Sequence, residues 1–314
     1  MIVLKPLSQA MKSIHLVLVA LSGFVLQSCV AMPVVLNGGS GEVELGHFPV
    51  GSKHAELEVE DGSKLRGVYV PADDPRAPIV LHLLRSSGSV TFGAEHAVLF
   101  ELNEMGIASL MLDYRGVGAS SGSRSSANLE ADAIAMYGEA VRLAGGIEDR
   151  VYVRSASLGT LATALILKDG ANPAGISMAV PVRSETMMQH YLKLRMPWLI
   201  RAIAQLPFTN PIDVDILQQL RRSTARLMVH TASNEYYLPG EEMNWMRQAV
   251  EDAGGDWFRV EGNHYEIAIQ SRRMFPAERG FYEAAPLAIA SAVPVASAPA
   301  PQALGEISAT QEEE

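Results

Sequence analysis

The fold is decided by one stretch of the sequence: Val151-Tyr152-Val153-Arg154-Ser155-Ala156-Ser157-Leu158-Gly159-Thr160. Its first five residues predict a β-strand because they are mostly β-branched or aromatic. A Leu- and Ala-rich segment, Leu158–Leu167, predicts a helix that begins immediately after Ser157. Small residues, Ser155 and Gly159, stand two positions before and two positions after Ser157, which allows a tight turn between strand and helix.

Two interpretations of Ser157 are open on this stretch alone. A serine on a sharp, strained strand-to-helix turn presents its hydroxyl for nucleophilic chemistry, the arrangement called a nucleophile elbow. The alternative is a serine that only caps the N-terminus of a helix. Ser155 occupies the position where a first glycine is usual in the elbow motif, so other residues must decide between the two.

Outward from this stretch, apolar strands alternate with helical patterns, which predicts one α/β domain with a mainly parallel central sheet flanked by helices. The domain is expected over residues 54–283, with a short helical cap at about 184–222. The expected strands are Ala55–Glu60, Leu65–Val70, Ile79–Leu84, Ala108–Tyr114, Val151–Ser155, Gly175–Val180, Ala225–Thr231 and Asp256–Val260, the first two forming a hairpin. The expected helices are Phe92–Asn103, Ala127–Leu143, Leu158–Leu167 and Glu241–Ala253.

A nucleophilic serine needs a base, and His264 is the expected one. In elbow folds the acid and then the histidine follow the serine in the chain. His190 falls in the helical insertion and His230 inside a strand, where burial is the ordinary expectation. His264 lies in a polar stretch, Glu261–Tyr265, which we expect to be a flexible turn after the last strand.

The acid that orients the base is expected to be Glu235. It is the carboxylate in the stretch between the strand ending at Thr231 and Pro239, where the side chain would accept the imidazole N–H. Asp213 and Asp215, which precede that strand, are the alternatives.

Together these motifs resemble the α/β-hydrolase superfamily, close to the serine hydrolases that include small esterases and serine aminopeptidase-like proteins. The resemblance rests on the Ser157 turn, on Glu235-x-x-Leu-Pro239, on Gly262-x-His264, and on Asp113-Tyr114-Arg115-Gly116-Val117-Gly118-Ala119-Ser120-Ser121-Gly122, which matches the group's D-x-R-G-x-G-x-S-x-G loop. It spans roughly residues 55–275 and implies the α/β-hydrolase fold, with a structural rather than catalytic role for residues 113–122.

The sequence departs from this group after the third expected strand. The group usually has His-Gly there, and this chain has Leu84-Arg85. Because an oxyanion is bound by backbone N–H groups, Ser86, with Arg85 as an alternative, is still expected to donate alongside Leu158. The Arg85 side chain either crowds the pocket, favours an anionic substrate group, or points to solvent.

The N-terminal residues resemble a bacterial lipoprotein signal peptide. Lys5 and Lys12 precede an apolar stretch, Ile14–Leu26, that is shorter than the roughly 20 residues of a membrane span. Leu26-Gln27-Ser28-Cys29 resembles a lipobox, which implies cleavage after residue 28 and acylation of Cys29. An ordinary secretory signal is the alternative. We expect a flexible tether over 29–53 and a lipid anchor in the bacterial envelope, with the outer membrane preferred because Val30 is not an Asp retention signal.

Composition excludes several other classes of protein. The net charge is −10 and no Lys- or Arg-rich run occurs, which argues against a nucleic-acid partner. The single cysteine excludes an intramolecular disulfide and a multi-thiolate zinc site. Residues 284–314 are rich in Ala and Pro and end in acids, and they predict a disordered tail.

The expected function is hydrolysis of a small carboxylic ester through a Ser157–His264–Glu235 triad, without metal or organic cofactor. Thioesters and peptides use the same constellation. A second hypothesis is a non-catalytic envelope lipoprotein that retains the hydrolase scaffold. Met187 and Tyr191, in the cap, are expected either to contact the acyl chain or merely to pack the insertion onto the domain.

Overall fold

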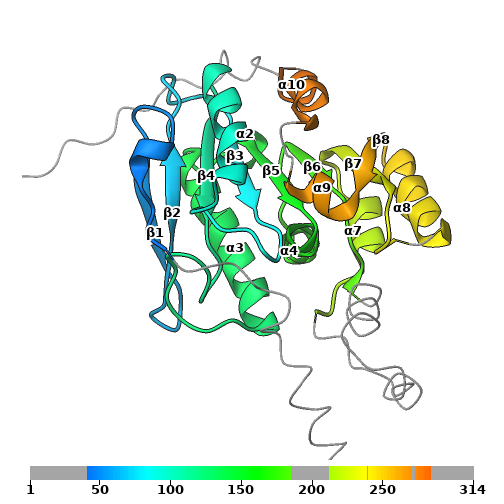
Figure 1. Ribbon diagram of the computed structural model, residues 1–314, viewed down its shortest axis with the longest axis horizontal. Helices are drawn as coiled ribbons and strands as arrows, with labels where there is room; N and C mark the ends of the chain where they lie inside the picture. The colour runs from blue at the N-terminus through cyan, green and yellow to red at the C-terminus, as the bar shows by residue number, and fades with distance from the viewer. Residues whose placement is uncertain (1–40, 185–211, 239, 270–272, 284–314) are drawn as a thin grey trace, which may run out of the picture.

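A computed structural model describes residues 41–184, 212–238, 240–269 and 273–283 (Figure 1). Within these residues, eight strands form one sheet in the order β1-β2-β4-β3-β5-β6-β7-β8. They are β1 (Lys53–Glu58), β2 (Lys64–Val70), β3 (Ile79–Leu83), β4 (Ala108–Leu112), β5 (Val151–Ala156), β6 (Gly175–Ala179), β7 (Arg226–Asn234) and β8 (Asp256–Asn263). β2 is antiparallel to β1 and to β4, and all pairs from β4 to β8 are parallel. The predicted hairpin and the mainly parallel sheet are confirmed.

Helices cover both faces of this sheet (Figure 1). The helices are α2 (Gly93–Glu104), α3 (Ser126–Leu143), α4 (Leu158–Lys168), α7 (Ile216–Arg222), α8 (Gly240–Asp252), α9 (His264–Ile269) and α10 (Phe275–Glu283), with short 3-10 turns at Leu45–His47 and Glu148–Arg150. α3, α4, α7 and α8 pack against one another in that order. α2 and α10 lie on the other side and are linked by an ion pair of 3.7 Å between Arg279 and Glu101.

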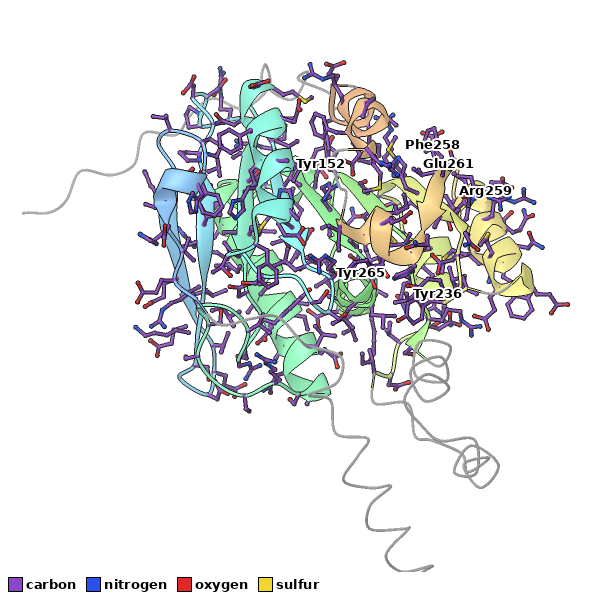
Figure 2. All side chains as sticks on the ribbon, in the orientation of Figure 1. Tyr152, Tyr236, Phe258, Arg259, Glu261 and Tyr265 are labelled. Atoms are coloured by element: carbon purple, nitrogen blue, oxygen red, sulfur yellow. The ribbon has the colours of Figure 1, made fainter. Side chains whose placement is uncertain are left out.

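The central strands are buried on both faces, which explains why they read as continuous apolar runs rather than alternating ones. Every residue of β3, β4 and β6 is buried. Tyr152 of β5 packs edge-on against Phe281 and Tyr282 of α10, with ring centroids 5.9 and 5.6 Å apart, and Figure 2 shows Tyr152 beside that helix. Aromatic contacts of this kind fix α10 to the sheet.

A buried ion pair lies in the same layer, between β5 and α10. Arg154 Nε is 3.0 Å from Glu278 Oε1, and both side chains are almost fully buried. Ser177 Oγ donates to the same carboxylate at 2.7 Å. His82, the register partner of Arg154 on β3, is buried, and burial lowers its pKa well below the usual range, so its imidazole is neutral.

The loop 113–122 is folded around the carboxylate of Asp113. Oδ1 of Asp113 accepts from Val90 N at 2.8 Å, and Oδ2 accepts from Ser89 Oγ at 3.1 Å. Gly118 has a φ of +53°, and a Cβ there would lie 1.8 Å from Asp113 Oδ2, so only glycine fits. Asp113 therefore joins its own loop to the segment that follows β3.

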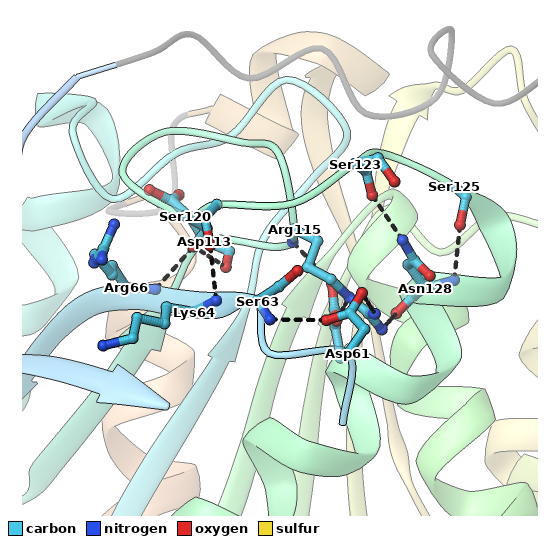
Figure 3. Close-up of polar contacts among 12 residues, drawn as sticks. Asp61, Ser63, Lys64, Arg66, Asp113, Arg115, Ser120, Ser123, Ser125 and Asn128 are labelled. Carbon is cyan, nitrogen blue, oxygen red and sulfur yellow. Dashed lines mark hydrogen bonds and ion pairs between the residues drawn. The ribbon is translucent and has the colours of Figure 1, made fainter. Parts of the chain in front are cut away.

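Arg115 and Ser120 fasten this loop to its surroundings (Figure 3). The backbone N–H of Arg115 donates to Asp132 of α3 at 2.8 Å, and its Nη1 lies 2.8 Å from Asp61. Ser120 Oγ accepts from the backbone N–H of Arg66 on β2 at 2.8 Å. These contacts support the structural role expected for the loop.

Two segments differ from expectation. Residues 44–53 were expected in the flexible tether, but Phe48 is buried and packs on His96, at 4.3 Å between ring centroids. The segment therefore belongs to the domain, because the apolar side chain of Phe48 is removed from water where it packs on His96 of α2.

α7 was expected within the cap, but its buried Ile216 and Leu220 join the main core, so α7 belongs to the helices flanking the sheet.

The pH dependence of stability should show the effect of the raised pKa of Asp113. Burial raises its pKa to about 6. Between roughly pH 4 and pH 6 the folded protein therefore holds a proton that the unfolded chain releases, so stability from this group is lost as the pH rises through about 6. In thermal denaturation, the Tm of wild type minus that of Asp113→Asn should increase as the pH falls from 7 to 4.5. A constant difference, or the same trend with the exposed-site control Asp73→Asn, would contradict the assignment.

Candidate active site

Ser157 occupies a strained turn between β5 and α4. Its φ is +50° and its ψ −116°, and among the described non-glycine residues only Val180 shares a positive φ. The turn is held by Ser157 N, which donates to Ala179 O at 3.0 Å, and by Thr160 Oγ1, which donates to Ser157 O at 2.7 Å. Such backbone costs on the order of 1–3 kcal/mol and persists only where the surroundings impose it.

The helix-cap interpretation of Ser157 is wrong. Its side chain makes no capping hydrogen bond to α4. Its Oγ instead lies 2.9 Å from Nε2 of His264, a residue 107 positions later in the chain. The strained turn thus directs the hydroxyl away from the helix and toward a potential base.

The small residues around Ser157 have different reasons for their size. A Cβ on Gly159 would lie 2.1 Å from Leu83 O and 3.1 Å from Leu84 O, so the carbonyls at the end of β3 exclude any side chain. Ser155 is 2% exposed, and its Oγ has no hydrogen-bond partner among the described residues. The position of Ser155 therefore accepts a small side chain, and the glycine expected there is not required.

His264 bridges Ser157 and Glu235. Its Nδ1 lies 2.9 Å from both Oε1 and Oε2 of Glu235, while its Nε2 contacts Ser157 Oγ. The Glu235 side chain is fully buried and that of His264 is 5% exposed. A carboxylate at Nδ1 keeps the proton on that nitrogen, so Nε2 is the atom free to accept the serine proton.

The backbone holds the Glu235 carboxylate in position. Oε1 accepts from Tyr236 N at 2.9 Å and from Tyr237 N at 2.8 Å. The Tyr237 ring packs edge-on against His264, with centroids 4.5 Å apart. These contacts hold the carboxylate of Glu235 beside His264, although the Glu side chain is one methylene longer than that of Asp.

Tyr236 and Tyr265 follow Glu235 and His264 in the sequence. Both are exposed and lie on the same side of the molecule in Figure 2, away from Phe258.

The expected flexible turn at Glu261–Tyr265 is absent. β8 continues to Asn263, and His264 is the first residue of α9. Asn263 N donates to Glu266 Oε2 at 3.1 Å, and Glu266 N donates to Asn263 Oδ1 at 3.0 Å, a reciprocal pair that starts the helix. The polar residues around His264 predicted an exposed turn rather than a helix start. In the structure, two of these polar side chains, Asn263 and Glu266, cap α9.

The alternative acids and base do not join this cluster. Asp215 caps α7 by accepting from Leu217 N at 3.0 Å, and Asp213 is exposed. His230 is buried and stacks on Phe258, with centroids 5.1 Å apart, and its ring nitrogens have no partner among the described residues. His190 lies outside the described residues.

The expected oxyanion donors belong to the helix that follows Ser157 and to the turn that follows β3. Leu158 is the first residue of α4, so its N–H has no acceptor inside the helix. Ser86 follows β3 in a turn closed by Gly88 N, which donates to Arg85 O at 2.9 Å. Because the carbonyls of Leu83 and Leu84 lie against Gly159, this turn begins beside the Ser157 elbow.

Arg85 does not point to solvent. Its residue exposure is 6%, and its Nε lies 3.1 Å from Oε1 of Glu95, in the first turn of α2. Its Nη1 donates to Ser87 Oγ. Because the guanidinium faces a carboxylate, its charge is compensated within the protein, and the idea that it binds an anionic substrate group loses its basis.

Sequence reasoning missed three contributors to the site. Nothing in the sequence marks Glu95 as part of the site, because a single acid in a predicted helix is ordinarily interpreted as an exposed charge. Tyr237 contacts both Glu235 and His264, and its position two residues after Glu235 is the available clue. Thr160 bridges Ser157 O and Val182 N, which donates to its Oγ1 at 3.2 Å.

Three expected site residues, Cys29, Met187 and Tyr191, lie outside the described residues. Within the part of the chain that the structure describes, no group of three or more His, Cys, Asp or Glu side chains is placed to hold a metal ion. The same part contains no helix with the length and apolar character needed to cross a bilayer.

Comparison with known proteins defines the fold. No protein-family model and no curated protein sequence matches the chain. An esterase of Pyrococcus furiosus is similar in structure, with a TM-score of 0.61 and 16% identity over 80% of this chain and 97% of the esterase. An alpha-beta hydrolase of Vibrio vulnificus gives a TM-score of 0.55 and 20% identity over 74% of this chain and 80% of that chain.

A third similar structure is a dipeptidyl peptidase 4 of Porphyromonas gingivalis, with a TM-score of 0.53 and 14% identity over 74% of this chain and 35% of the peptidase. The sheet order, the flanking helices and these similarities establish the α/β-hydrolase fold predicted from the sequence.

The elbow geometry predicts a specific stability effect. Gly159→Ala should destabilise the protein by about 1–3 kcal/mol, because the new Cβ meets backbone carbonyls that cannot move independently. Gly138→Ala, in the middle of α3 with open space around its Cα, is the matched control and should stabilise by up to about 1 kcal/mol. Urea denaturation measures both. Equal free energies of unfolding for the two variants would contradict the packing described.

Proposed function

We propose that the protein is a serine hydrolase that cleaves carboxylic esters. The observation that carries the proposal is the chain of contacts from Ser157 Oγ through His264 to Glu235, each 2.9 Å long, built on a strained elbow. Two short contacts and one unfavourable backbone conformation at the same residue are a specific combination. A protein that had kept only the scaffold would have no use for them, which argues against the non-catalytic alternative.

In the proposed reaction, His264 Nε2 takes the proton of Ser157 Oγ as the oxygen forms a bond to the acyl carbon. The Leu158 and Ser86 N–H groups bind the carbonyl oxygen as it becomes negative. His264 then protonates the leaving alcohol, and the same residue activates the water that releases the acyl group from Ser157. Glu235 stabilises the imidazolium in both halves of the reaction.

Carboxylic esters are the proposed substrate class because their cleavage needs the fewest groups in the site. Their alkoxide leaving group needs only the proton from His264. The similar structures include an esterase, which supports this class, and a dipeptidyl peptidase, which keeps amides as the second class. Met187 and Tyr191 remain the residues proposed to contact the acyl chain.

Alanine substitutions test the triad. Ser157→Ala and His264→Ala should each lower kcat for a p-nitrophenyl ester by about 10⁴-fold or more, and Glu235→Ala by about 10²- to 10⁴-fold. The losses should not add, because the three residues act as a unit. Ser155→Ala is the matched control: it removes a nearby buried hydroxyl that has no partner among the described residues, and kcat should stay near wild type. A Ser157→Ala enzyme with wild-type kcat would refute the assignment.

We propose further that Cys29 carries the lipid that holds the enzyme at a bacterial membrane, with the outer membrane preferred. Replacing the thiol removes the atom that is acylated, so Cys29→Ser should leave an unprocessed precursor or move the protein to the soluble fraction. Cell fractionation with immunoblotting measures this. Ser157→Ala, which keeps the cysteine, should remain in the membrane pellet. Normal cleavage and unchanged membrane association of Cys29→Ser would contradict the lipid anchor.

A further inference from the structure

The segment after β3 carries one proposed oxyanion donor, Ser86, and the structure fixes it at both ends. At its start, the carbonyls of Leu83 and Leu84 pack against Gly159. At its end, Ser89 and Val90 are bound by Asp113. Between these points the backbone turns within four residues, closed by the hydrogen bond from Gly88 N to Arg85 O.

A buried ion pair holds the middle of this segment, residues 85–88, to α2. Arg85 Nε lies 3.1 Å from Glu95 Oε1, an ion pair rather than an aligned hydrogen bond, and the two side chains are 7% and 8% exposed. The same guanidinium donates to Ser87 Oγ within the turn. Arg85 therefore contacts both the helix beside the turn and the turn itself.

The location of this pair matters because an oxyanion hole works only when its donors are already in position. A donor must sit within about half an ångström of its productive geometry, and losing one costs about 10²- to 10³-fold in kcat. The N–H of Ser86 is one bond away from the carbonyl carbon of Arg85. Any freedom in the Arg85 backbone therefore becomes freedom in that donor.

We propose that Arg85 and Glu95 are positioning residues: their buried ion pair fixes the backbone of residues 85–87 so that the Ser86 N–H is pre-oriented for the oxyanion. The ion pair supplies from a side chain the constraint that holds this backbone. The inference rests on the proposed function, because it assigns a role within that reaction.

A second buried pair, Arg154–Glu278, provides the matched control. Both pairs join a strand or its following loop to a helix on the α2 and α10 side of the sheet, and both are nearly fully buried. Glu278 is bound by Arg154 and Ser177, and neither of those residues belongs to the segment 84–90. Arg154 also acts electrostatically on Glu95, but loss of the Arg154–Glu278 pair leaves the contacts of Arg85 with Glu95 and with Ser87 in place.

The test compares Arg85→Met, Glu95→Gln, the double variant of both, and the control double variant Arg154→Met with Glu278→Gln. Each single variant leaves one buried charge unpaired and is expected to fold less stably, whereas the double variants remove both charges and should recover stability. Arg85→Lys keeps the charge opposite Glu95 and should recover part of the lost activity.

Two measurements are made on each folded variant: kcat and KM for p-nitrophenyl acetate, and deuterium uptake of the amides in residues 84–90. The Arg85→Met/Glu95→Gln protein should exchange faster in that segment and lose about 10- to 100-fold in kcat, with KM changed less than about threefold. The control double variant should keep kcat within about threefold of wild type and exchange in 84–90 unchanged.

Unchanged exchange in 84–90, or a kcat no lower than in the control, would overturn the positioning role. A loss of activity that appears only as a higher KM would overturn it as well, because a misplaced oxyanion donor weakens the transition state rather than substrate binding. Failure of the proposed function gives a different result: the wild-type enzyme itself would hydrolyse no ester, and the positioning role would fall with it.

Discussion

The strained turn at Ser157 is the constraint on which the rest of the site depends. Hydrogen bonds to Ser157 O and from Ser157 N hold its positive φ. Gly159 lets α4 start close to the end of β3, where a Cβ would meet the carbonyl of Leu83. Parallel strands bring their carboxyl ends to one edge of the sheet, so the loops after β3, β5, β7 and β8 meet there. Those loops and ends carry Arg85–Ser86, Ser157, Glu235 and His264 respectively. The turn therefore points one hydroxyl at the place where the other three segments converge.

Much of this was predictable from the sequence, since local patterns determine it. Strand-like runs, the Ser157–Gly159 spacing and the order of acid and base all follow from short segments, and the structure brings the three expected residues together. The errors arose where a residue's partner is distant in the chain. The direction of the Arg85 side chain was left open because no neighbouring residue in the sequence indicates Glu95 as its partner. Phe48 was assigned to a tether because the residue it packs on, His96, lies far along the chain, on α2. The polar residues around His264 suggested a turn, yet Asn263 pairs with Glu266 to begin α9.

Two buried ion pairs connect helices to the sheet and to the segment after β3. A buried ion pair adds little net stability against apolar residues of the same size, but breaking it by removing one partner is costly. Arg154–Glu278 joins the sheet to α10, and Arg85–Glu95 joins the segment after β3 to α2. Burial raises the pKa of Glu95, and the charges of Arg85 and Arg154 oppose that shift.

The central claim is that Ser157 is an activated nucleophile, and covalent trapping tests it most directly. A fluorophosphonate reacts with a serine whose proton is taken by a base, losing fluoride and leaving a phosphonyl group on the oxygen. Mass spectrometry of the treated full-length protein, followed by peptide mapping, locates the adduct. The account predicts one phosphonyl group, on Ser157, formed only while His264 is intact. An unmodified protein, or an adduct on any other residue, would contradict it.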